Sequence, residues 1–263
     1  MVIVTYSEAR LVKRHRGTMP IILTCPHDGT ETPPGVTERD EANNPPHCGR
    51  FKNGRDLRAA EITERVAQRI LESTGLSPYV VIARFQRRFI DANREARCAF
   101  VDADARPFYD EYHSGIAEFT QELLAQNDSR GFLFDIHGTG VIEQDPADLY
   151  LGTDNGGTLS TGFPRSRLFE RHGLHGLLAA VRRQSLTPSG DPIFQYVVSP
   201  ADAAATETPA VNGGFTVENQ SDRMNCVQIE IAKPIRDDDT LRGFLVEDLA
   251  FAIPNFVRRY APF

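Results

Sequence analysis

Short apolar runs alternate with longer amphipathic segments along most of the chain, and this pattern constrains the fold more than any other feature. Three runs have the length and apolar character of buried strands, namely 20–26 (PIILTCP), 79–85 (YVVIARF) and 131–136 (GFLFDI). Two intervening segments repeat apolar residues at helical spacing, namely 57–73 and 107–125. Strands that alternate with helices predict an α/β fold with a mainly parallel sheet and helices on both faces.

The second half of the chain continues the alternation. Further strands are predicted at 148–152, 194–198 and 227–231. Further helices are predicted at 165–183 and from about Asp239 onward, the last one interrupted or kinked at Pro254. A chain of 263 residues suits one large domain, so we expect residues 1–263 to form a single unit.

Residues 28–55 separate the first predicted strand from the first predicted helix. They are rich in glycine, proline, asparagine and charged residues, which predicts a long loop. Loops of this length are typically functional or mobile. We therefore expect this segment to be an active-site loop.

Net charge and cysteine usage exclude several function classes. The net charge is -7 and the pI is about 5.5, whereas nucleic-acid binding needs a clustered basic surface. The first ten residues lack the pattern of a signal peptide, and no run approaches the ~20 apolar residues of a membrane span. We expect a cytoplasmic protein with neither nucleic-acid nor membrane partners.

The four cysteines form no CxxC pair and are expected to be free thiols, namely Cys25, Cys48, Cys98 and Cys226.

Three polar residues lie at or near predicted strand ends. His27 follows the first strand, His137 follows the third, and Glu230 lies in a late one. Ligands of such sheets bind beyond the carboxyl ends of the strands, where these side chains can converge. A catalytic zinc takes three nitrogen or oxygen ligands and leaves a position for water, and a nearby glutamate can move the proton. Singly, each histidine is more typical of a structural residue, whereas a glutamate buried in an apolar strand requires a partner or a role.

Two neighbouring patterns have more than one interpretation. Asp135 could orient His137 through the other ring nitrogen, or it could form only local hydrogen bonds. Residues 87–94 (RRFIDANR) offer arginine forks that suit a carboxylate ligand. The same segment could be a salt-bridged turn, because Asp91 and Glu95 are available as partners.

Four short motifs occur in a characteristic order, namely 26–29 (PHDG), 88–94 (RFIDANR), 135–138 (DIHG) and 228–230 (QIE). Their order resembles that of the N-formylglutamate amidohydrolase family, which is related to zinc carboxypeptidases and aspartoacylases. The motifs span most of the chain. The resemblance implies a phosphorylase/hydrolase-like three-layer sandwich with a mixed central sheet. It also implies zinc ligated by His27 and His137, with Glu230 as the general base.

The same resemblance assigns the substrate contacts. Asn93 and Arg94 would hold the α-carboxylate of the substrate, and Arg88 would polarise the scissile carbonyl and stabilise the developing oxyanion. These assignments imply a zinc-dependent amidohydrolase acting on a small N-acyl amino acid. A zinc carboxypeptidase or cell-wall peptide hydrolase of the same fold, or a non-catalytic carboxylate-binding relative, are the alternatives.

Two departures from the family pattern concern the metal and the pocket. Related carboxypeptidases use a His-x-x-Glu pair, but the residue three after His27 is Thr30. The third ligand is therefore Glu31, one position further, or Asp56 at the start of the following helix, and we favour Asp56. The tyrosine that commonly follows the glutamate strand is absent from residues 231–236 (IAKPIR).

Overall fold

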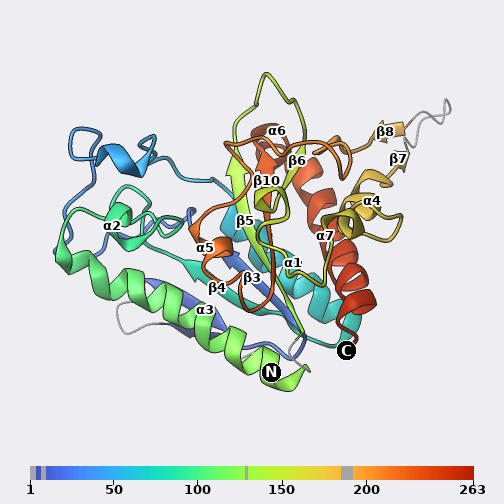
Figure 1. Ribbon diagram of the computed structural model, residues 1–263, viewed down its shortest axis with the longest axis horizontal. Helices are drawn as coiled ribbons and strands as arrows, with labels where there is room; N and C mark the ends of the chain where they lie inside the picture. Colours follow the sequence, from blue (N-terminus) through green and yellow to red (C-terminus); the bar gives the residue numbers. More distant parts are fainter. Residues whose placement is uncertain (1–3, 7–9, 128–129, 185–191) are drawn as a thin grey trace.

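An eight-stranded sheet forms the centre of the structure, a computed structural model that describes residues 4–6, 10–127, 130–184 and 192–263 (Figure 1). Along the sheet the strands follow the order β1 (Val4–Tyr6), β2 (Val12–His15), β4 (Tyr79–Ala83), β3 (Ile21–Cys25), β5 (Phe132–Thr139), β10 (Asn225–Ala232), β6 (Leu149–Gly152) and β9 (Val198–Ser199). A separate two-stranded pair consists of β7 (Arg183–Gln184) and β8 (Pro192–Phe194).

The four inner strands are parallel to one another. β3 pairs with β4 and β5, and β5 pairs with β10, so their carboxyl ends meet at one edge of the sheet. Antiparallel pairs occur further out, at β1–β2, β2–β4 and β10–β6. The mixed, mainly parallel sheet predicted from the sequence is therefore confirmed.

Helices cover both faces of the sheet, which confirms the three-layer α/β sandwich (Figure 1). One face packs against α1 (Ala59–Thr74), α4 (Leu174–Ala179) and α7 (Asp239–Tyr260), and the other packs against α3 (Arg106–Gln126). Shorter helices are α2 (Ala96–Ala99), α5 (Phe215–Glu218), α6 (Lys233–Asp237), η1 (Pro46–Cys48), η2 (Ala103–Ala105), η3 (Asp154–Gly156) and η4 (Arg165–Leu168). None of the described helices is long and apolar enough to cross a bilayer.

The apolar stripe read from the sequence is the buried face of α1. Ala59, Ile62, Val66 and Ile70 all lie in the core between this helix and the sheet. The helix ends at Gly75, whose φ of 74° is left-handed and whose amide donates to the carbonyl of Leu71.

Two predictions for the second half of the chain were wrong in detail. The helix expected at 165–183 is broken into η4 and α4, because the extended backbone at Gly173 folds back onto the carbonyls of Arg167 and Leu168. The strand expected at 194–198 is reduced to the end of β8 and the start of β9. The last helix begins at Asp239, as predicted, and continues through Pro254 to Tyr260 without an interruption.

A disulfide joins Cys48 to Cys98, so the prediction of four free thiols was wrong for this pair. Cys25 and Cys226 are free and buried. The pair is separated by 50 residues in the sequence, but the fold places the two Cα atoms 5.5 Å apart, within the reach of a disulfide. The bond ties the loop at η1 to α2.

We predict that this disulfide stabilises the fold. Closing a loop of 50 residues lowers the entropy of the unfolded chain, which corresponds to about 3–4.5 kcal/mol of unfolding free energy. Urea unfolding of the wild type should shift to lower midpoints when dithiothreitol is added. The double variant Cys48→Ala/Cys98→Ala is the control, because the reductant should leave its midpoint unchanged. Equal midpoints for the wild type with and without reductant would contradict a bond in solution.

Candidate active site

The polar residues of interest meet at the point where the strand order of the sheet reverses. From β3 the chain passes through α1 to β4 on one side, and from β4 it passes through α3 to β5 on the other side. The carboxyl ends of β3 and β5 lie side by side at this point, and the crevice beyond such strand ends is where ligands of such sheets bind. His27 follows β3, His137 lies in β5, and Glu230 on β10 is in register with His137.

Two histidines and one carboxylate converge in this crevice. The Asp56 Oδ2 atom lies 3.1 Å from Nδ1 of His137 and 3.4 Å from Nδ1 of His27. One ligand atom from each of the three residues lies within 4.8 Å of the others, and all three residues are buried. The structure thus brings together residues that are 29 and 81 positions apart, which could hold a metal ion.

Of the two candidates for the third ligand, the structure brings Asp56 to the histidines. Its carboxylate points at them, while the start of α1 is hydrogen-bonded by Asp28, whose Oδ2 accepts from the Ala60 amide at 3.1 Å. Glu31 instead pairs with Arg84 at 2.9 Å, and its side chain is 45% exposed. Glu31 is therefore engaged elsewhere, and it is not part of the group of side chains that could hold a metal.

Each histidine is oriented by a second carboxylate. The Nε2 atom of His27 lies 2.7 Å from Asp91 Oδ1, and Nε2 of His137 lies 2.8 Å from Asp135 Oδ2. These bonds leave both Nδ1 atoms facing Asp56. Metal-binding histidines are typically held in this way, because the second hydrogen bond fixes the ring and makes it a stronger ligand. Of the two interpretations of Asp135, the structure shows the orienting one.

The charges in the crevice stabilise one another. Burial alone would raise the pKa of Asp56, but the hydrogen bond from His137 and the charges of His27 and His137 outweigh it and hold that pKa well below its usual value. Burial would lower the pKa of His137, but the charge and hydrogen bond of Asp135 raise it above its usual value. Without a metal, the carboxylates therefore favour a protonated histidine.

Two polar atoms of the crevice are buried and have no hydrogen-bond partner among the described residues, namely Nδ1 of His27 and Oε2 of Glu230. Buried polar atoms are normally paired, so these two indicate a missing ligand. The donor set of two imidazoles and one carboxylate is that of a catalytic zinc with an open position. Burial raises the pKa of Glu230 to about 7, which suits a group that takes and returns a proton near neutral pH. Zinc therefore fits the residues present.

A cavity of about 210 Å³ opens beside these residues. Of the residues assigned to the site from the sequence, only Arg88 is absent from its lining. The lining residues are His27, Lys52, Asp56, Arg87, Asn93, Arg94, His137, Gly138, Thr139, Ala210, Gly213, Gly214, Gln228 and Glu230. A cavity of this size can hold a small molecule.

Arg88 does not line the cavity, although the resemblance places it in the site. Its side chain is 44% exposed and lies 3.8 Å from Glu38. The preceding residue, Arg87, lines the cavity instead: its Nε lies 3.0 Å from Asp91, and its Nη1 lies 3.9 Å from Asp56. Residues 87–89 form a turn, where successive side chains point in different directions, so a shift of one position changes the surroundings entirely.

Asn93 closes one wall of the cavity. Its Oδ1 accepts from the Thr216 amide at 2.8 Å, and its Nδ2 lies 3.3 Å from His137 Nε2 and 3.4 Å from Gln228 Oε1. A Cβ on Gly214 would lie 2.3 Å from Asn93 Nδ2, so only glycine permits this close approach. Gly213 and Gly214, which precede α5, are therefore part of the cavity wall.

Arg94 borders the cavity, but its nitrogens are engaged with the protein. Its two Nη atoms donate to the carbonyls of Cys48 and Arg50, and its Nε lies 3.3 Å from Asp91. Sequence reasoning missed two other cations of the cavity, Arg87 and Lys52. Arg87 stood next to the predicted arginine, and the only signal for Lys52 was its place in the predicted active-site loop.

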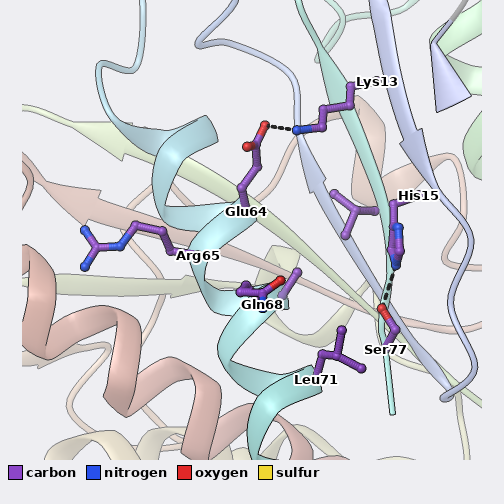
Figure 2. Close-up of a pocket in the computed structure, with 9 residues that line it drawn as sticks. Lys13, His15, Glu64, Arg65, Gln68, Leu71 and Ser77 are labelled. Atoms are coloured by element: carbon purple, nitrogen blue, oxygen red, sulfur yellow. Dashed lines mark hydrogen bonds and ion pairs between the residues drawn. The ribbon is translucent and has the colours of Figure 1, made fainter. Parts of the chain in front are cut away.

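A second hollow of about 320 Å³ lies between β2 and α1 (Figure 2). Its polar side chains pair with one another: Lys13 with Glu64 at 2.7 Å, and His15 Nε2 with Ser77 Oγ at 2.6 Å. It lies at the amino end of β4, away from the carboxyl edge of the parallel strands. The first cavity, where buried atoms lack partners, is therefore the candidate active site.

Comparison with known proteins identifies the fold. No protein-family model and no curated protein matches the chain. Among solved structures it is similar to the N-formylglutamate amidohydrolase of Ralstonia eutropha JMP134, with a TM-score of 0.61, 17% identity and 98% of each chain covered. It is also similar to a gene product of Agrobacterium tumefaciens, with a TM-score of 0.58, 17% identity and coverage of 95% of this chain and 96% of that chain. The fold thus agrees with the resemblance drawn from the four motifs.

We predict that Asp56, and not Glu31, supports metal binding. Asp56→Ala should weaken Zn²⁺ binding by more than about 100-fold, because losing a direct ligand costs more than losing a residue that merely orients one. Glu31→Ala is the matched control and should bind Zn²⁺ like the wild type. Calorimetric titration with Zn²⁺ measures both affinities. Loss of binding in the Glu31 variant alone would reverse the assignment.

Proposed function

We propose that the protein is a zinc-dependent amidohydrolase of the N-formylglutamate amidohydrolase family that cleaves the amide bond of a small N-acyl amino acid. The observation that carries this proposal is the convergence of His27, Asp56 and His137 beside a buried glutamate with a free oxygen. The shared fold with an N-formylglutamate amidohydrolase and the order of the four sequence motifs support it.

In this proposal the metal is held by Nδ1 of His27, Nδ1 of His137 and the carboxylate of Asp56. Zinc supplies a Lewis acid that lowers the pKa of water toward ~7 and polarises a carbonyl oxygen. Asp91 and Asp135 hold the two imidazoles through Nε2, so that both Nδ1 atoms lie near Asp56 and would be free to bind the metal.

Glu230 acts in this proposal as the general base and then as the general acid. Gln228 donates to its Oε1 at 3.1 Å, which leaves Oε2 directed into the cavity. Oε2 takes a proton from the attacking water as its oxygen bonds to the acyl carbon. The same oxygen then returns the proton to the amide nitrogen as the carbon–nitrogen bond breaks, so a carboxylic acid and an amine leave.

Arg87 takes the role that the resemblance gave to Arg88. Its Nε is held by Asp91, which fixes the guanidinium at the cavity wall with its Nη1 near Asp56. A cation at this position stabilises the oxygen of the scissile carbonyl as negative charge develops on it. Asn93 borders the same space and offers its amide to the substrate.

We predict that Glu230→Gln retains the metal but loses turnover. The amide cannot accept the proton, and general acid–base catalysis contributes about 100-fold or more to the rate. Zinc content by elemental analysis and hydrolysis of N-formyl amino acids measure the two effects separately. Turnover close to that of the wild type would remove Glu230 from the role of base.

We predict that Arg87→Met and Arg88→Met have different effects on turnover, although the two arginines are neighbours in the sequence. Loss of one oxyanion-stabilising donor lowers kcat about 100-fold or more, so Arg87→Met should be strongly impaired. Arg88→Met should retain near-wild-type kcat, because this exposed side chain lies outside the cavity. Steady-state kinetics on one substrate compares them, and the reverse order of effects would restore the assignment made from the sequence.

The substrate class is tested with a panel of N-formyl amino acids, N-acetyl amino acids and short peptides on zinc-loaded protein. The cavity of about 210 Å³ supports the acyl amino acids. Hydrolysis of the peptides alone would instead make the protein a peptidase of the same fold. Tight binding without any turnover would make it a carboxylate-binding relative.

A further inference from the structure

The active-site cavity is bordered by three cationic side chains, which differ in how many of their nitrogens are bonded to other groups of the protein. The guanidinium of Arg94 is engaged through all three nitrogens, with Asp91 and with the carbonyls of Cys48 and Arg50. Arg87 is tied through its Nε to Asp91. Arg87 keeps both Nη groups for the carbonyl oxygen of the substrate, whereas each of the three nitrogens of Arg94 already donates to the protein.

The third cation, Lys52, forms no ion pair with any described residue, although it lines the same cavity. The cation left for a substrate carboxylate, beside Arg87 at the carbonyl oxygen, is therefore Lys52 from the loop at 28–55 rather than Arg94.

The backbone that carries Lys52 is anchored at several points. Arg39, a buried side chain, lies with both Nη atoms 3.4 Å from the Lys52 carbonyl, and its Nη1 also donates to the Arg87 carbonyl at 2.8 Å. A few residues earlier, the disulfide at Cys48 and the hydrogen bonds from Arg94 hold the same stretch. A lysine on an anchored loop can present its ammonium to a ligand without ordering the backbone first.

From these contacts we propose that Lys52 binds a carboxylate of the substrate and that Arg94 is a positioning residue, which holds residues 48–50 in place rather than contacting the ligand. This inference rests on the proposed function, because it concerns the substrate of that site. An ammonium on a flexible stem recognises a carboxylate as a compact point charge, whether it is the α-carboxylate or one on the side chain of the amino acid.

Three probes distinguish the two carboxylates: N-formyl-L-glutamate, N-formyl-L-glutamine, which lacks the side-chain acid, and N-formyl-L-isoglutamine, which lacks the α-acid. Lys52→Met should lower kcat/KM about ten-fold or more, mainly through KM, for probes that keep the bound carboxylate. The probe that lacks this carboxylate should be affected far less. Lys52→Arg should restore most of the loss.

Lys233→Met is the matched control, because Lys233 is exposed and pairs with Asp237 on α6. It should behave like the wild type on all three probes. The inference is overturned if Lys52→Met equals Lys233→Met, or if it impairs the acid and both amides equally.

The positioning role of Arg94 has its own readout, the ratio of kcat/KM on the acid to kcat/KM on the discriminating amide. Arg94→Met should lower this ratio in the wild-type background. In the Lys52→Met background it should lower the ratio no further, because the group that it positions is already gone. A further fall of similar size would mean that Arg94 contacts the substrate itself.

Failure of the proposed function is distinguishable from failure of this inference. If the zinc-loaded wild type hydrolyses none of the probes, the proposed function fails, and calorimetric titration with N-formyl-L-glutamate then tests Lys52 alone. Binding that is weakened about ten-fold by Lys52→Met but not by Lys233→Met supports the inference. Equal binding by both variants, or no binding by the wild type, overturns it.

Discussion

The parallel pairing of β3, β5 and β10 is the constraint on which the rest of the site depends. It brings three carboxyl strand ends to one edge and sets Glu230 beside His137 in register. Side chains alternate between the two faces of a strand, so a slip of one residue would turn Glu230 away from the metal ligands. The apolar neighbours of Glu230 fix that register because they must stay buried: Val227, Ile229 and Ile231.

The need to pair buried carboxylates is a second constraint on the candidate site. Asp91 and Asp135 are fully buried, and a buried carboxylate is tolerated only when it is paired and hydrogen-bonded. Both meet this requirement by binding a histidine, and Asp135 also accepts a bond of 2.6 Å from Thr24. The pairing that stabilises the carboxylates therefore also orients the imidazoles toward Asp56, so the same contacts serve the stability of the fold and the geometry of the candidate site.

The segments around the crevice are joined by arginines whose donors bind backbone carbonyls. Arg39 and Arg94 hold the loop that delivers Lys52. Arg236 on α6 donates to the carbonyls of Leu57 and Thr139. These carbonyls lie close in the sequence to Asp56 and His137, so a buried arginine ties the elements that carry two of the ligands.

The sequence by itself determined the α/β sandwich, the inner strands and the gathering of His27, His137 and Glu230 at strand ends. These features depend on local apolar periodicity and on the rule that parallel strands share a carboxyl edge. Only the tertiary structure decided that Arg87 rather than Arg88 lines the cavity, that Cys48 meets Cys98, and that each nitrogen of Arg94 donates to the protein. The direction of a side chain in a turn, and contacts between segments 46 or 50 residues apart, depend on packing that no local pattern encodes.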